Sequence, residues 1–311
     1  MPASPPTIGC LAQVACTWEV LARKAGNVCP GREFPDLTVN DFLVSAAAIA
    51  PILNEAPTQP LGVTILRAIE ATRRVVKTNT NLGIVLLLAP LASVPLGEPL
   101  CSGLSRVLEQ TTVEDARNVF TAIRLAKPGG LGTVQEADVY DEPTLPLRDV
   151  MALANERDLI AAQYEDGFLF VFNQVLPQLA RRVEQYKNIE RAIVETQMEV
   201  LRIACDSHIH RKLGSVAATE VKLAAQAIGG LETPAGRRAF GEFDAWLRAD
   251  NHARNPGTTA DLIAAGLFAA LREKRIAIDA PFVWEDHPFS TADEHGAAEP
   301  QLKRGKDCSR E

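Results

Sequence analysis

Aromatic residues and basic clusters are the scarcest features of this 311-residue sequence. Phe, Trp and Tyr together make up 5% of the chain, and runs of β-branched and aromatic residues that would build a large sheet are thin. The formal net charge is −7 and no dense basic stripe occurs, which argues against sequence-independent nucleic-acid binding. With 47% hydrophobic and 23% charged residues, the chain otherwise has an ordinary globular composition.

Cysteine pairs, signal sequences and membrane spans are also missing. The six cysteines are scattered without a C-x-x-C pair, which favours a reducing compartment over a disulfide framework or a structural zinc site. The N-terminus lacks a basic start followed by an apolar block. The longest apolar run, 84–96, is interrupted by two prolines and is shorter than the about 20 residues that a bilayer requires. We therefore expect a cytoplasmic protein without membrane contact.

Several common catalytic motifs do not occur. The sequence has no G-x-x-x-x-G-K-[ST] loop, no G-x-G-x-x-G after a strand, no G-x-S-x-G and no H-E-x-x-H. A P-loop, a dinucleotide-binding fold, a hydrolase nucleophile elbow and a zincin site are thereby excluded. Any bound nucleotide is held in another way.

Helical periodicity is the dominant pattern that remains. Apolar residues recur at three- and four-residue spacings, which predicts amphipathic helices. The predicted helical ranges are 8–24, 36–53, 61–77, 81–93, 99–109, 112–126, 147–186 (in part), 188–204, 217–228, 234–248 and 258–273. The Pro-Gly-Gly breaker at 128–130 predicts a long loop over 127–146, and alternation over 275–284 indicates a short hairpin. The fold class is therefore all-α: a single-domain multi-helix bundle over residues 1–290, followed by a disordered polar tail over 291–311.

Two clusters of small polar residues stand directly before apolar helices. The run 255–261, Asn-Pro-Gly-Thr-Thr-Ala-Asp, places hydroxyl groups and a carboxylate at a helix start, and 77–83, Lys-Thr-Asn-Thr-Asn-Leu-Gly, does the same with amides and hydroxyls. Free N–H groups at a helix N-terminus favour an anion, and a neighbouring carboxylate can hold a metal ion that bridges to it. Ordinary capping by Thr258 or Thr259 is the alternative for the first cluster, and a single N-cap is the alternative for the second.

A third polar cluster spans residues 206–214, Asp-Ser-His-Ile-His-Arg-Lys-Leu-Gly. Asp206 can bind a metal ion or act as a base, and Arg211 and Lys212 can hold phosphate oxygens. The two histidines, at positions 208 and 210, lie on different helix faces, so we expect them to be surface or supporting residues. Together the three clusters indicate a polyphosphate and a divalent cation.

These motifs, with the stretch 19–30, occur in an order that resembles the triphosphoribosyl-dephospho-coenzyme A synthase family, over about residues 10–272. The resemblance implies an all-α fold and a transfer in which ATP loses adenine and its 5-triphosphoribosyl group passes to 3′-dephospho-coenzyme A. It also implies Mg²⁺ for the triphosphate. The product would be a precursor of an acyl-carrier prosthetic group.

The resemblance implies roles for individual residues. Asp206 and Asp261 would hold the metal and the triphosphate, and one of them would help to deprotonate the acceptor hydroxyl. The residues expected to bind the ATP substrate are Lys24, Asn79, Thr80, Asn81, Arg211, Lys212, Asn255, Gly257, Thr258 and Thr259.

The sequence departs from the better-known members of the family at one of these clusters. Those members carry Asn-Thr-His-Lys-Gly where this chain has Asn-Thr-Asn-Leu-Gly at 79–83, so a His and a Lys are missing. The sequence therefore resembles a shorter, divergent branch. A different acceptor, such as a methanopterin-type cofactor precursor, and a nucleotide-binding helical protein without turnover remain as alternatives. A homodimer is compatible with the sequence.

Overall fold

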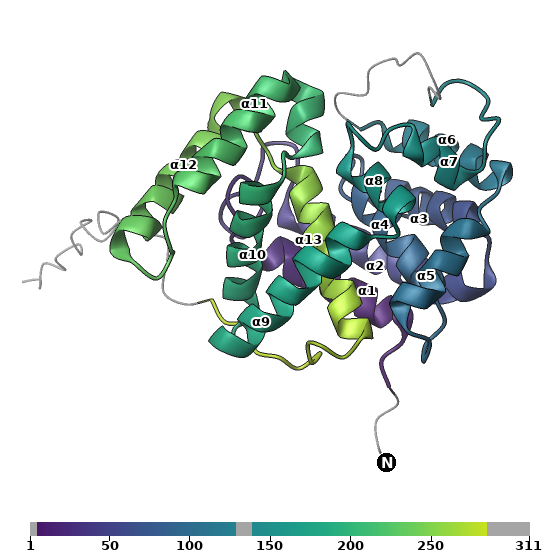
Figure 1. Cartoon of the computed structure of the whole chain (residues 1–311), viewed down its shortest axis with the longest axis horizontal. Coiled ribbons are helices and arrows are strands. Elements are labelled where there is room, and N and C mark those ends of the chain that lie inside the picture. The colour runs from purple at the N-terminus through teal and green to yellow at the C-terminus, as the bar shows by residue number, and fades with distance from the viewer. Residues whose placement is uncertain (1–4, 129–138, 285–311) are drawn as a thin grey trace, which may run out of the picture.

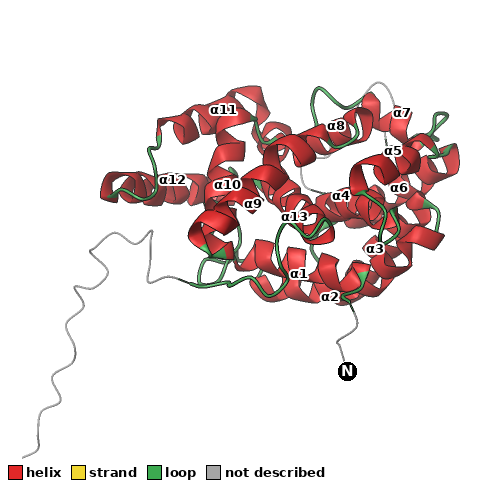
Figure 2. Cartoon of the chain, turned by 60° about the horizontal axis from the view of Figure 1, so that its bottom comes forward, coloured by secondary structure: helices red, strands yellow, loops and turns green. Residues whose placement is uncertain are grey.

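The computed structural model describes residues 5–128 and 139–284. The described residues form thirteen α-helices, one 3₁₀ turn and one π-helical turn, and contain no β-strand (Figures 1 and 2). The elements are α1 (Ile8–Leu21), α2 (Val39–Glu55), η1 (Ala56–Thr58), α3 (Leu61–Val75), α4 (Leu82–Ser93), α5 (Leu100–Glu109), α6 (Val113–Ala126), α7 (Leu147–Ala152), α8 (Leu159–Asp166), η2 (Val171–Val175), α9 (Leu176–Tyr186), α10 (Ile189–Ile203), α11 (Ser207–Ala227), α12 (Pro234–His252) and α13 (Gly257–Arg272). The predicted all-α class is confirmed.

Several helices begin where their capping residues dictate. Thr38 and Asp41 form a capping box at the start of α2, and Thr112 and Asp115 form another at the start of α6. In each box the Thr hydroxyl and the carboxylate satisfy main-chain N–H groups that have no partner within the helix. Asp115 also accepts a hydrogen bond from the N–H of Gly62 at 2.7 Å, which fixes α3 against α6.

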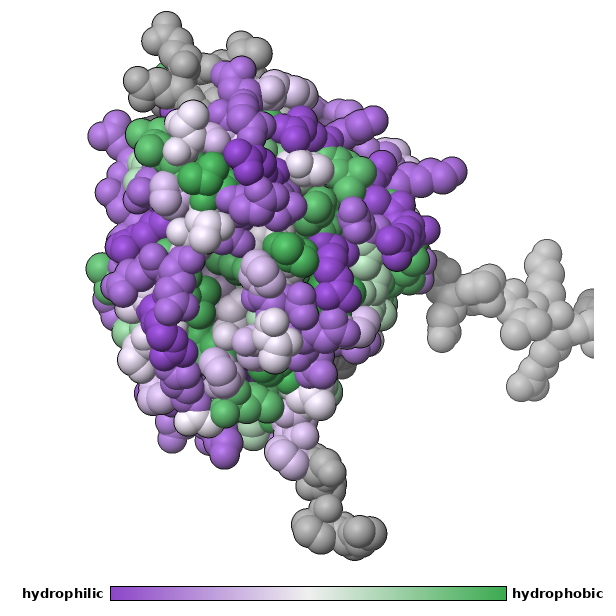
Figure 3. Space-filling view, turned by 90° about the vertical axis from the view of Figure 1, so that its right-hand side faces the viewer, coloured by the Kyte–Doolittle hydropathy of each residue, from purple (hydrophilic) through white to green (hydrophobic). Residues whose placement is uncertain are grey.

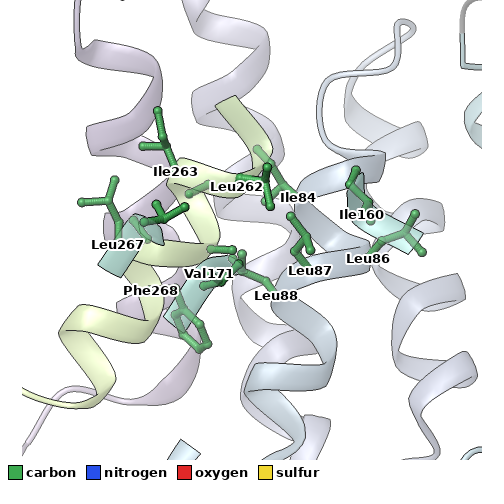
Figure 4. Close-up of a cluster of buried hydrophobic side chains, with 14 of the residues drawn as sticks. Ile84, Leu86, Leu87, Leu88, Ile160, Val171, Leu262, Ile263, Leu267 and Phe268 are labelled. Carbon is green, nitrogen blue, oxygen red and sulfur yellow. The ribbon is translucent and has the colours of Figure 1, made fainter. Parts of the chain in front are cut away.

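Two apolar helices, α4 and α13, form the centre of the core. Every residue of α13 from Leu262 to Leu271 is buried, as is every residue of α4 from Ile84 to Ala92. Figure 4 shows side chains of the two helices packed together, with Ile84 beside Leu262 and Leu88 near Phe268. Because both helices are apolar on all sides, they must be enclosed by other helices. Helices α1, α9, α10 and α11 contact α13, while α3 and α5 contact α4.

The outer helices present mixed surfaces. Figure 3 views the side on which α5, α6 and α7 lie, and hydrophilic residues there alternate with short hydrophobic patches. This pattern is expected for amphipathic helices that bury one face. None of the helices in the described ranges is both long and apolar enough to cross a membrane.

Three parts of the chain differ from the sequence-based expectations. The hairpin predicted over 275–284 is wrong: the N–H groups of Arg275 and Ile276 bond back to the Ala270 carbonyl, and no strand follows. Helix α11 begins ten residues before the predicted start at 217, because Asp206 caps it, and it is kinked at Gly214. Part of the predicted 127–146 loop and the whole 291–311 tail lie outside the described residues.

Candidate active site

A cavity of about 460 Å³ lies where the first turns of α4, α11 and α13 approach the segment that follows α1. Its lining comes from five stretches of the chain: 19–42, 73–84, 126–127, 208–212 and 251–261. The packing of α4 against α13 positions two of these stretches, because both begin at the same end of the central helix pair. All three polar clusters found in the sequence therefore contribute to one cavity.

Asp261 offers this cavity a carboxylate without a partner. It lies in the first turns of α13, and its Oδ2 atom faces Gly83 so closely that a Cβ at position 83 would collide with it. Among the described residues, nothing donates a hydrogen bond to Asp261 or forms an ion pair with it. Burial raises the pKa of Asp261 well above its usual range, and the negative charges of Glu19 and Asp206 raise it further. Such a carboxylate in a cavity is typical of a functional group.

Glu19 is a second carboxylate on the cavity wall. It is buried near the end of α1 and forms an ion pair with Lys24, with 2.9 Å between Oε1 and Nζ. The same ammonium group donates to the carbonyl oxygens of Glu19 and Ala22, so its three protons have three acceptors within the chain. Lys24 itself lines a neighbouring hollow of about 420 Å³ and not the cavity.

Asp206 is buried and bonded to two helix N-termini. Its Oδ1 atom accepts hydrogen bonds from the N–H groups of His208 (2.9 Å) and Ile209 (3.1 Å) at the start of α11. Its Oδ2 atom accepts from the N–H (2.7 Å) and the hydroxyl (2.8 Å) of Thr259 in α13. Burial raises the pKa of Asp206, and these four hydrogen bonds only partly offset it. The structure thus places Asp206 behind the cavity wall, where it ties α11 to α13.

The start of α13 is arranged differently from the predicted Thr cap. Pro256 is the N-cap and no side chain caps the helix, so capping by Thr258 or Thr259 is wrong. Thr258 is buried outside the cavity lining, whereas Gly257 lines the cavity against His208. A Cβ at Gly257 would come within 2.5 Å of His208 Nδ1. Asn255, also on the cavity wall, accepts a hydrogen bond of 2.7 Å from Asn27 Nδ2.

Several side chains of the polar run before α4 form hydrogen bonds within the protein, and one oxygen atom is left without a partner at the cavity. Asn79 Oδ1 accepts from the N–H of Leu82 (3.1 Å), and the Thr80 hydroxyl lies 2.6 Å from that of Ser45. Asn81 Nδ2 donates to Thr72 (3.0 Å), but its Oδ1 atom is buried without a partner. Asn81 is the N-cap of α4 and its side chain does not cap the helix, whereas Asn79 bonds to the first N–H of the helix from two residues further back. The Asn81 oxygen is therefore left available.

Unpartnered polar atoms are concentrated at this cavity. Within the described ranges, four buried side-chain nitrogen or oxygen atoms lack a hydrogen bond, and three of them belong to cavity-lining residues: Asn81 Oδ1, His208 Nε2 and His252 Nδ1. A buried polar group without a partner is costly in a folded protein, so this cluster indicates a polar ligand. Burial lowers the pKa of His208 to about 3, so its imidazole is neutral near pH 7. The expected surface position of His208 is wrong, because the side chain is largely buried in the cavity wall.

Four cationic side chains line the cavity as well: Arg73, Lys77, Lys127 and Lys212. Lys77, Lys127 and Lys212 are exposed, as expected for groups that meet a ligand from solvent. Partial burial lowers the pKa of Lys212, and the neighbouring charge of Arg211 lowers it further. Arg211 lies outside the lining and pairs with Asp158, with 3.3 Å between Nη1 and Oδ2.

Comparison with known proteins places this architecture in a family. The family model described as ATP:dephospho-CoA triphosphoribosyl transferase matches residues 5–279. The chain belongs to this family. A crystal structure from Archaeoglobus fulgidus, provisionally described as a triphosphoribosyl-dephospho-coA synthase, is similar with a TM-score of 0.59 and 27% identity. The match covers 74% of this chain and 98% of that chain. No curated protein matches.

Membership of this triphosphoribosyl transferase family makes the chain a pentosyltransferase, as the ordered motifs predicted. Two of the cations in the cavity lining come from other elements than the 77–83 run: Lys127 follows α6 and Lys212 belongs to α11. Lys212 was predicted from its polar cluster, whereas Lys127 reaches the cavity through tertiary packing that the local sequence does not reveal. Glu19 lies in the stretch 19–30 that carries the resemblance, which assigns it no role, and no sequence motif marks Arg73 as a cavity residue.

Proposed function

We propose that this protein transfers the 5-triphosphoribosyl group of ATP to a hydroxyl of 3′-dephospho-coenzyme A and releases adenine. Membership of the triphosphoribosyl transferase family supports this reaction class. The observation that carries the proposal is the cavity itself, which combines carboxylates, unpartnered polar atoms and four cations. A triphosphate needs cations, and a glycosyl centre needs a carboxylate.

In this reaction the glycosidic C1′–N9 bond breaks and its electron pair leaves with adenine, which takes up a proton. The acceptor oxygen bonds to C1′ and gives up its own proton to a base. Asp261 is the base that the geometry favours, because its carboxylate faces the cavity and accepts no hydrogen bond from the described residues. Glu19, held by Lys24, places negative charge beside the cationic ribose in the transition state.

The triphosphate would lie against Lys77, Lys127 and Lys212, and Arg73 would add a fourth positive charge. Asp206 would act indirectly by fixing the start of α13, on which Asp261 lies. Its four hydrogen bonds leave it poorly placed to bind a metal ion or to take a proton.

Mg²⁺ fits this cavity as a companion of the triphosphate. Within the described ranges no three His, Cys, Asp or Glu side chains are grouped to hold a metal ion by themselves. Mg²⁺ usually binds through one or two carboxylates together with substrate phosphates. One oxygen of Asp261 and the unpartnered Asn81 Oδ1 atom would supply the protein oxygens, and the ion would neutralise charge on the phosphates. The second Asp261 oxygen would remain to accept the proton of the acceptor hydroxyl.

Chromatography of reaction mixtures tests the proposal. The protein is incubated with ATP and Mg²⁺, with and without 3′-dephospho-coenzyme A, and free adenine is quantified. We expect adenine only when the acceptor is present, together with a product that contains both substrates' phosphates. ATP binding without adenine release in either mixture would contradict the proposed donor chemistry with this acceptor.

A further inference from the structure

The cavity has an apolar wall that phosphates and ribose do not require. Val20, Val28 and Phe34 form a small buried hydrophobic cluster separate from the main core, with Leu37 and Phe42 packed against it. All five of these residues line the cavity. Apolar surface on a cavity wall favours an apolar, planar part of a ligand.

His252 extends this wall with a second aromatic ring. It stacks on Phe34 with ring centroids 4.0 Å apart and an interplanar angle of 22°. The Nδ1 atom of His252 is buried and has no hydrogen-bond partner. The wall therefore offers both an aromatic face and an unused polar atom to a ligand.

The backbone that carries His252 is unusual. Asp250, Asn251 and His252 have φ values of 54°, 57° and 57°, all in the left-handed region. Three consecutive non-glycine residues in this region are energetically unfavourable. Backbone strain of this kind clusters at active sites and ligand-binding segments.

We infer that the wall formed by Phe34 and His252 binds an adenine base. This inference deepens the proposed function and rests on it for the choice of adenine, which occurs in both ATP and 3′-dephospho-coenzyme A. The aromatic rings supply stacking area, and the unpartnered His252 Nδ1 atom supplies a hydrogen bond to the edge of the base. The cationic side chains of the cavity are then left to the phosphates.

Two substitutions separate base binding from folding. His252→Asn removes the ring but keeps a residue type that tolerates left-handed backbone, and Phe34→Leu keeps apolar volume but removes the aromatic face. The matched controls are His210→Asn and Phe172→Leu, because neither residue lines the cavity. Circular dichroism and thermal unfolding verify that each variant is folded.

Calorimetric titration of the full-length protein then measures four probes: ATP, 3′-dephospho-coenzyme A, free adenine and inorganic tripolyphosphate. We expect each cavity variant to lower the affinity for free adenine, and for ATP or dephospho-coenzyme A, by about tenfold. The affinity for tripolyphosphate should stay unchanged. A loss of affinity for ATP alone would assign the wall to the adenine of the donor substrate. A loss of affinity for dephospho-coenzyme A alone would assign it to the adenine of the acceptor substrate. Unchanged affinity for both nucleotides, or an equal loss for tripolyphosphate, would overturn the inference.

These titrations need no turnover, so they fail independently of the proposed reaction. A protein that binds adenine through Phe34 and His252 but never releases it from ATP would contradict only the transfer. A protein that releases adenine normally while both cavity variants bind all probes as the wild type does would contradict only the base site.

Discussion

Asp206 and Asp261 are alike in sequence context and opposite in structure. Both are acidic residues at the start of a helix, and both were predicted to hold metal and triphosphate. Asp206 is bonded to four donors from two helices, whereas Asp261 faces the cavity with no partner among the described residues. The contrast teaches that unused hydrogen-bonding capacity, and not residue type at a helix start, distinguishes a ligand-binding carboxylate from a structural one.

The largest effect is expected at Asp261. Asp261→Asn keeps the shape of the side chain and removes the base, so kcat for adenine release should fall by about 10³-fold. Steady-state kinetics at saturating ATP measures this change. Activity within a few-fold of the wild type would show that another group is the base.

The free energy of unfolding of the same variant tests the state of the Asp261 carboxyl in the folded protein. The pKa of Asp261 is raised in the folded protein, so the wild type loses stability as pH rises from the unfolded pKa through the folded one. Asp261→Asn does not titrate and should be more stable than the wild type above that window. The gain should disappear toward low pH, where the wild-type carboxyl is protonated in both states. Urea unfolding across the pH range measures the difference.

Gly83 tests how closely the Asp261 carboxylate must be held. Gly83→Ala favours the helix by propensity, but its methyl group would collide with Asp261 Oδ2. The displaced carboxylate should lower kcat/KM by about 100-fold. Gly229→Ala is the control, because a Cβ there meets nothing within 4 Å. Equal kinetics for the two variants would contradict the placement of Asp261.

Asp206 should be needed mainly for stability. Asp206→Asn replaces one acceptor oxygen with an amide NH₂ group, which would face N–H donors at a helix N-terminus. The free energy of unfolding should therefore fall by about 2–4 kcal/mol. Asp158→Asn is a matched control, because Asp158 caps α8 and otherwise makes only a partly exposed ion pair with Arg211, so its loss should cost about 1 kcal/mol. Similar unfolding free energies for the two variants would argue that the link from α11 to α13 contributes little.

Lys212 and Arg211 are neighbours on α11, and a smaller effect is expected from replacing them. Lys212 lines the cavity, so Lys212→Ala should raise the KM for ATP by about five- to tenfold, and less at high salt. Arg211→Ala should change KM less, since Arg211 pairs with Asp158 outside the lining. Kinetics at two ionic strengths measure both. A larger effect from Arg211 would place the triphosphate elsewhere.

The smallest effect concerns His208. Because its pKa is lowered to about 3, its imidazole should stay neutral between pH 5 and pH 8. The Cε1–H resonance of His208, assigned with a His208→Gln variant, should not move across this range in an NMR titration. Movement with a midpoint near 6.5 would show that His208 is not buried as described.

Most of the fold could be predicted because it follows from local chemistry. Apolar spacing and caps such as Thr38 and Thr112 set helix starts to within a few residues. The predicted hairpin does not form, because the alternating hydrophobic pattern over 275–284 is outweighed by the hydrogen bonds to the Ala270 carbonyl that close the end of α13. The cavity was only partly predictable: Asn81 and Asp261 lie in recognisable clusters, but Lys127 and His252 reach their positions through packing between distant segments.

Adenine release by Asp206→Asn and Asp261→Asn, each corrected for its folded fraction, tests the central claim most directly. The account predicts that folded Asp206→Asn protein keeps activity within about tenfold of the wild type, whereas Asp261→Asn loses about 10³-fold. The reverse order would contradict the account. Asp206 would then be the chemical group, and the unpartnered carboxylate of Asp261 would not mark the reacting centre.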